Sequence, residues 1–142
     1  MGAARRLVDV EVGEVLPART IHVDRATLVQ YAGASLDRNR IHWDERFAKE
    51  VGLPDVIAHG MFTMGAAIDL VSEWAGDAGR VVEYGTRFTR PVVVPWGSGA
   101  DLEVSAVVKA VDGQAGRATV DLTVSSGGAK VLGRAQAVVA LD

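Results

Sequence analysis

Asp37, Asn39 and His42 are the residues of this chain whose types and spacing could do chemistry, since all three lie within the polar stretch 35–42. A carboxylate next to an imidazole can transfer protons near neutral pH, because each group holds the other in its working protonation state. The same residue types are also common in ordinary turns, where they bond nearby backbone groups. The pattern alone therefore leaves an acid/base pair and a simple turn both open.

His59 and Gly60 form a second segment of interest, directly before a long apolar run that predicts a helix. The first backbone N–H groups of a helix have no intrahelical partner, and the helix dipole adds partial positive charge there. Such a position could stabilise an oxyanion, for example an enolate forming on a thioester carbonyl, and glycine would let the substrate come close. Gly60 could equally serve only to ease a tight turn, and we expect His59 to shape that turn.

The elements expected to position these segments are mostly helices in the first half of the chain and strands in the second, which indicates an α+β fold. A short strand over 18–23 precedes a helix over 24–33. Residues 35–42 are too irregular for either element, and Asp44 caps a second short helix. Residues 60–75 predict a helix that is apolar nearly all round and must therefore be buried.

Four runs in the second half have the pattern of strands, at 80–90, 102–110, 118–124 and 130–141. Apolar and polar residues alternate along the two middle runs, which is typical of strands with one buried face. The Gly127-Gly128 pair is a strong hairpin signal before the last run. The pattern predicts an antiparallel sheet wrapped around one buried helix, in a single domain over 1–142.

Composition excludes several classes of protein. The 142 residues contain no cysteine, which rules out disulfides and thiolate metal sites, and the net charge of −3 gives no basic surface for nucleic acid. The three histidines share no ligand spacing, so we expect no metal site. No apolar run is long enough for a signal peptide or a membrane span, and a cytoplasmic protein is the default expectation.

The two chemical segments together resemble the MaoC-like, (R)-specific enoyl-CoA hydratase family. Its signature runs from an aromatic residue through small residues to Gly-Asp-x-Asn-Pro-x-His, with alanine or serine six residues later. The matching positions hold Tyr31, Asp37, Asn39, His42 and Ala48, and the start of the family's central helix matches Ala58, His59, Gly60 and Met61. The likeness covers nearly the whole chain and is greatest toward catalytic subunits of actinobacterial (3R)-hydroxyacyl-carrier-protein dehydratases. Tyr31 and His59 are expected to support the site.

The resemblance implies a hot dog fold, in which an antiparallel sheet wraps around a long central helix. It implies interconversion of (3R)-hydroxyacyl and trans-2-enoyl thioesters, carried on coenzyme A or an acyl carrier protein, without a cofactor. Asp37 and His42 would move the protons at C2 and at the 3-hydroxyl, and the Gly60 N–H would hold the thioester oxygen. Asn39 would orient the loop or the water. A homodimer, or a heterodimer with a second hot dog subunit, is expected.

Two residues beside Asp37 depart from the family pattern: Leu36 replaces a glycine, and Arg40 replaces a proline. Leucine disfavours positive φ, so we expect the loop to follow a different path. Arg40 restores a backbone N–H that could loosen the loop, and its guanidinium is expected near Asp37. Both changes predict weaker activity or an altered substrate.

Two other functions stay open at this point. A hot dog thioesterase also sets a helix N-terminus against a thioester, but it normally carries its carboxylate on or near the central helix, whereas Asp37 precedes that helix. A non-catalytic partner subunit of a two-subunit dehydratase commonly lacks the Asp and His pair that this chain keeps. Leu36 and Arg40 leave that second alternative open.

Overall fold

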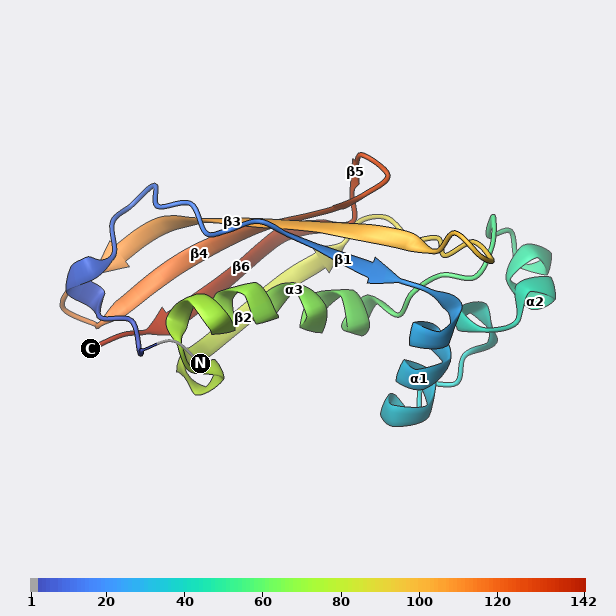
Figure 1. Cartoon of the computed structure of the whole chain (residues 1–142), viewed down its shortest axis with the longest axis horizontal. Helices are drawn as coiled ribbons and strands as arrows, with labels where there is room; N and C mark the ends of the chain where they lie inside the picture. The colour runs from blue at the N-terminus through green and yellow to red at the C-terminus, as the bar shows by residue number, and fades with distance from the viewer. Residues whose placement is uncertain (1–2) are drawn as a thin grey trace.

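The computed structural model describes residues 3–142, which form a six-stranded antiparallel sheet with a long helix against one face (Figure 1). The strands lie in the order β1-β3-β4-β6-β2, and β5 pairs with β4. The strands are β1 Arg19–Val23, β2 Val81–Phe88, β3 Ala100–Asp112, β4 Arg117–Ser126, β5 Ala129–Lys130 and β6 Leu132–Ala140. The helices are α1 Arg25–Ser35, α2 Glu45–Glu50 and α3 Gly60–Ala75, with short 3-10 turns η1 Leu7–Asp9, η2 Arg40–His42 and η3 Ala78–Arg80.

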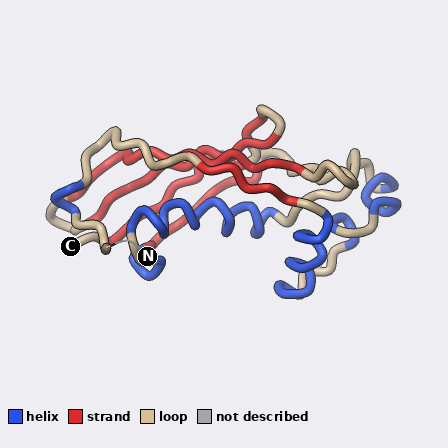
Figure 2. Tube along the Cα trace, in the orientation of Figure 1, coloured by secondary structure: helices blue, strands red, loops and turns tan. Residues whose placement is uncertain are grey.

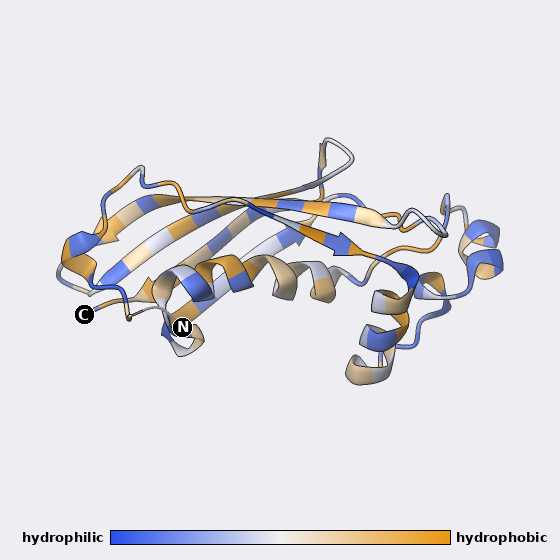
Figure 3. Cartoon of the chain, in the orientation of Figure 1, coloured by the Kyte–Doolittle hydropathy of each residue, from blue (hydrophilic) through white to orange (hydrophobic). Residues whose placement is uncertain are grey.

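The sheet follows from the period of two in its strands. Every second residue of β3 from Leu102 to Val108 is buried, while the residues between them are exposed. These buried positions stand opposite buried residues of β4, for example Val104 opposite Val124. Figure 3 shows the resulting alternation of hydrophobic and hydrophilic residues along the strands. The apolar face of the sheet and the buried side of α3 together form the core.

The last predicted strand is broken, so its expected continuity was wrong. Gly127 and Gly128 both have positive φ and make the predicted hairpin turn, but β5 ends after two residues. Val131 then leaves the ladder of β5, and the chain resumes as β6, which pairs with both β4 and β2. Figure 2 shows the short β5 hairpin rising away from the main sheet.

The long helix α3 has the predicted bounds, but it is buried on one side only. The sheet covers the side that carries Thr63, Ala67, Leu70, Val71 and Ala75. The exposed stripe repeats every four residues and consists of Met61, Gly65, Asp69 and Glu73. The prediction of burial all round was wrong because this stripe includes two carboxylates, both paired with Arg19 of β1. No helix within residues 3–142 is long and apolar enough to cross a membrane.

Helices α1 and α2 gather at the end of the sheet where α3 begins (Figure 1). Arg25 at the start of α1 fixes this arrangement, because its Nε donates to the carbonyl of Val94 at 2.7 Å and its Nη2 pairs with Asp55 at 2.7 Å. Both Arg25 and Asp55 are largely buried, so the pair is shielded from solvent. The loop 36–39 is thereby placed against the first turn of α3.

Candidate active site

Leu36 ends α1 in the left-handed region, with φ 64° and ψ 8°. The helix runs through Gly33, which was predicted to end it, and stops two residues later at Ser35. The prediction that leucine would send the loop along a different path was also wrong, because Leu36 takes the conformation that glycine adopts freely. That conformation costs a residue with a Cβ about 1–2 kcal/mol. The loop therefore follows a glycine-like path without the glycine.

The backbone of Asp37 is fixed by two hydrogen bonds, and its exposed carboxylate lies beside a cavity. Its N–H donates to Ser35 Oγ at 3.1 Å, and its carbonyl accepts from Nε2 of His59 at 2.9 Å. One carboxylate oxygen also accepts from the Asn39 N–H at 3.2 Å. The Asn39 side chain accepts from the Ile41 N–H and begins η2. Asn39 thus caps η2 within the loop, and its side chain does not line the cavity.

His42 is buried, and its ring is oriented by the segment that precedes α3. Nδ1 lies 2.7 Å from the carbonyl of Ile57. Because a carbonyl oxygen only accepts, Nδ1 carries the hydrogen and Nε2 keeps a free lone pair. Burial lowers the pKa of His42 below its ordinary value of 6.5, and the bond to Ile57 opposes this only in part. His42 is therefore a neutral imidazole at pH 7 and can act as a base.

Arg40 turns away from Asp37, contrary to the prediction. Its guanidinium pairs with Asp44 at 2.8 Å and lies over the Phe47 ring, 4.4 Å from the ring centroid. Asp44 also caps α2 by accepting from the Phe47 N–H. The arginine that replaces the family's proline thus ties η2 to α2, with its guanidinium paired to Asp44 and not to Asp37. It firms the loop that it was expected to loosen.

Gly60 is the first residue of α3 and borders a cavity of about 620 Å³. No residue within 3–142 accepts from its N–H, which points out of the first turn as the helix geometry requires. A Cβ at this position would lie 2.9 Å from Cε1 of Phe88, so any other residue here would displace that ring from its present place beside Gly60. The cavity also contains Tyr31, Asp37, His42 and His59, so the structure brings the predicted site residues together, with Asn39 just outside.

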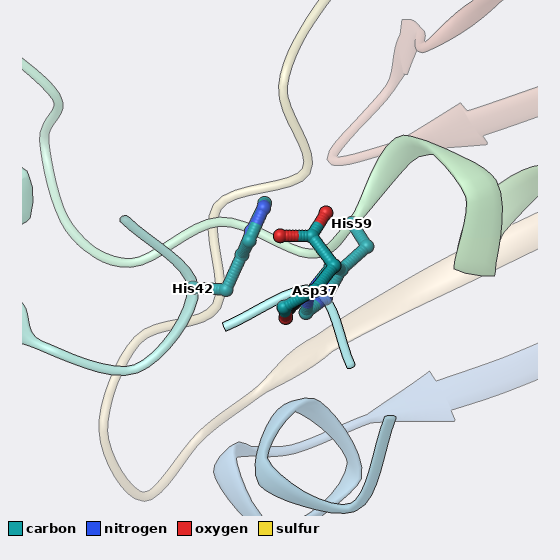
Figure 4. A group of neighbouring side chains, drawn as sticks. All are labelled: Asp37, His42 and His59. Carbon is teal, nitrogen blue, oxygen red and sulfur yellow. Dashed lines mark hydrogen bonds between the residues drawn. The ribbon is translucent and has the colours of Figure 1, made fainter. Parts of the chain in front are cut away.

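His59 lies beside both residues of the predicted acid/base pair, although it is 17 residues or more away along the chain. One possible ligand atom from each of Asp37, His42 and His59 lies within 4.8 Å of the others (Figure 4). A carboxylate with two imidazoles can bind divalent metals. However, the two imidazole rings are stacked, 3.6 Å apart between centroids and 22° between planes. Nearly parallel ring planes do not direct the lone pairs of both imidazoles to one ion at bond lengths of about 2.1 Å, so the stacking argues against an ion shared by the two rings.

Two further residues of the cavity wall were not singled out by their sequence. Thr63 faces the cavity one turn into α3, and its hydroxyl is buried without a hydrogen-bond partner among residues 3–142. Phe88 lies at the end of β2, across from Gly60. The helical spacing of Thr63 from Gly60 was a usable signal, because residues three apart share a face. The approach of Phe88 depends on the sheet and had no local signal.

This geometry defines a class of hot dog proteins. In that class a buried imidazole and a loop carboxylate lie beside the first turn of the central helix. Residues 9–127 match the family model described as MaoC like domain, and the chain therefore belongs to this family. A solved MaoC-like dehydratase is 42% identical with a TM-score of 0.95, covering 98% of this chain and 43% of that one. The solved R-hydratase PhaJ1 from Pseudomonas aeruginosa is 25% identical with a TM-score of 0.82, covering 96% of this chain and 86% of that one.

Among curated proteins, 3-hydroxyacyl-thioester dehydratase X of Mycobacterium tuberculosis is 39% identical over 79 residues. That match covers 56% of this chain and 27% of the relative. The chain thus spans less than half the length of this relative and of the solved MaoC-like dehydratase. The family and the hot dog fold predicted from the sequence are confirmed.

Proposed function

We propose that this chain is a hydro-lyase domain that interconverts (3R)-hydroxyacyl and trans-2-enoyl thioesters. The observation that carries the proposal is the group that lines one cavity: Nε2 of His42, the carboxylate of Asp37, and the N–H of Gly60, which has no acceptor among residues 3–142. The named dehydratase and hydratase relatives support the same reaction class. A carbonyl polarised at Gly60 and a base near its α-carbon are what this reaction needs.

In the dehydration direction, the thioester oxygen binds at the Gly60 N–H, where negative charge develops as C2 loses its proton. Neutral His42 and the carboxylate of Asp37 take that proton and deliver one to the departing 3-hydroxyl. The C3–O bond breaks, the C2–C3 double bond forms and water leaves, so the pair ends with the protons it began with. Hydration follows the same steps in reverse. No metal or redox cofactor takes part.

The carrier of the acyl group is a phosphate-bearing thiol, either coenzyme A or the prosthetic arm of an acyl carrier protein. Arg90 lines the cavity and forms no ion pair with any carboxylate within residues 3–142, so its guanidinium is free to meet a phosphate. Met61 and Phe88 give the same cavity an apolar wall for the acyl chain. The role of Arg90 predicts that activity falls with rising salt.

A second hot dog unit pairs with this one in the working enzyme. Strand β2 is an edge of the sheet, and its Val82 and Phe88 are both more than half exposed. Long exposed edges with apolar side chains favour pairing with another chain. The solved MaoC-like dehydratase is more than twice as long as this chain, which leaves room for a second unit of this size. Light scattering after size-exclusion chromatography should give a mass above that of the monomer.

The test of the proposed reaction follows the absorbance of a conjugated enoyl thioester as hydration removes it. The protein should consume the substrate, and Asp37→Asn or His42→Gln should each lower the rate by about 100-fold or more. Asp101→Asn and His22→Gln are matched controls, because both residues are exposed, pair with each other across β3 and β1, and do not line the cavity. Release of free thiol from a saturated thioester would instead indicate a thioesterase. Parental rates in Asp37→Asn and His42→Gln would refute the proposed pair.

A further inference from the structure

The side chain of His59 is not used to cap α3, although His59 is the residue immediately before that helix. It makes no side-chain hydrogen bond to the first turn. The ring is instead 2% exposed and turns toward the loop that carries Asp37. A buried, polar ring that does not cap its own helix needs another explanation, because burying imidazole without a use is costly.

Three contacts fix the His59 ring. Its Nε2 donates to the carbonyl of Asp37 at 2.9 Å, which also defines Nε2 as the protonated nitrogen. Its face stacks on the His42 ring at 3.6 Å between centroids. The Tyr31 ring lies 4.7 Å away, tilted by 59°. His59 is therefore in contact with both members of the proposed acid/base pair, one through its N–H and the other through its ring.

We propose that His59 is a positioning residue that sets the separation and orientation of Asp37 and His42. This inference rests on the proposed function, and it assigns His59 no direct contact with the reacting atoms. Leu36, directly before Asp37, has a strained left-handed conformation. The hydrogen bond from His59 to the carbonyl of Asp37 holds the loop on the other side of that residue. The stacked ring in turn prevents the imidazole of His42 from tilting away from the carbonyl of Ile57.

The electrostatic surroundings of His42 agree with this role. The titratable groups around it are Asp37 in the loop, His59 at the start of α3, and Tyr31 and Arg90 in the cavity wall. Burial is the main cause that lowers the pKa of His42, and the neighbouring imidazole of His59 lowers it further. A positive charge on the buried His42 ring would lie against the stacked His59 ring, which disfavours that charge. The His42 ring is thus kept neutral.

Two variants separate the contacts of His59. His59→Phe keeps a ring for stacking but loses the N–H to Asp37, whereas His59→Gln keeps an N–H donor but loses the ring. His22→Gln is the matched control, because His22 is exposed on β1 and pairs only with Asp101. Displacing a catalytic group by about 1 Å can cost roughly 100-fold in rate, so kcat should fall by about 10- to 100-fold in both variants. KM should change less than about threefold, as expected when substrate binding is untouched.

A second readout does not depend on activity. The pKa of His42, followed by NMR titration of its ring signals, should rise in both variants, because the neighbouring imidazole no longer disfavours its protonation. A rise supports the role of His59 even if no thioester is hydrated, and inactivity of the parental protein would refute only the proposed function. An unchanged His42 titration together with parental kcat in both variants would overturn the inference and leave His59 as a packing residue. Thermal unfolding of each variant shows whether it is folded.

Discussion

Leu36 offers a direct test of the loop geometry, because glycine and alanine at this position should reverse their usual order of stability. Leu36 has φ 64°, and its side chain is 71% exposed. Leu36→Ala removes the outer part of the side chain but keeps the Cβ and therefore the left-handed strain. Leu36→Gly removes the same atoms and the strain. The two variants differ only in what the Cβ does to the backbone.

The expected difference can be worked from two opposing contributions. The left-handed conformation costs a residue with a Cβ about 1–2 kcal/mol, while glycine loses about 0.5–1 kcal/mol more in conformational entropy on folding. Leu36→Gly should therefore be more stable than Leu36→Ala by up to about 1.5 kcal/mol, with a central value of about 0.75 kcal/mol. At an ordinary right-handed or extended position, the alanine variant would be the more stable one. The sign of the difference is thus diagnostic.

Urea denaturation measures this difference through the midpoints of unfolding, provided that both variants show the same dependence on denaturant. The glycine variant should also keep the parental rate of enoyl thioester hydration within about twofold, because the loop already follows a glycine-like path. A Leu36→Ala protein that is more stable than Leu36→Gly would show that residue 36 is not left-handed in solution. The loop that carries Asp37 would then follow a path other than the glycine-like one described above.

Gly60→Ala should lower kcat/KM by about tenfold or more, because its Cβ would lie 2.9 Å from the Phe88 ring and displace that ring from its place in the cavity wall. Kinetics of Gly60→Ala with and without Phe88→Leu should show partial recovery in the double variant, and no recovery would place the effect elsewhere. The value of kcat should fall on the acid side of the pH profile with a midpoint below pH 6.5. Burial lowers the pKa of His42, and the base is lost only when the pH falls through that lowered pKa. A midpoint above pH 6.5 would contradict a neutral His42 base. Treatment with a chelator followed by desalting should leave the rate unchanged, because the stacked rings of His42 and His59 do not direct their lone pairs to one ion; a lost rate restored by zinc would refute this.

The sequence predicted those features that depend on neighbours along the chain. Strands with a period of two, the hairpin at Gly127, and the bounds of α3 all follow from local patterns. Asp37 and His42 could be paired because only four residues separate them within one loop. The family resemblance then linked this loop to Gly60, which lies on another element. The fold and the main site residues were accessible for these reasons.

The errors concern features that depend on distant contacts. The composition of α3 does not show how much of the helix surface the sheet covers, so its exposed stripe was not predicted. The partner of Arg40 was mistaken because Asp44, four residues later, competes for the same guanidinium with better geometry. The conformation of Leu36 contradicts its own propensity, since the capping position at the end of α1 demands positive φ. The stacking of His59 on His42 required the folded chain.

Hydration of a 2-enoyl thioester in deuterated water shows whether Asp37 and His42 add water across its double bond. The parental protein should yield the (3R)-hydroxyacyl thioester with one deuterium at C2, as read by mass spectrometry and chiral chromatography. Asp37→Asn and His42→Gln should yield almost none, while Asp101→Asn should match the parent. A (3S) product, or undiminished deuterium incorporation in Asp37→Asn and His42→Gln, would contradict the assigned site.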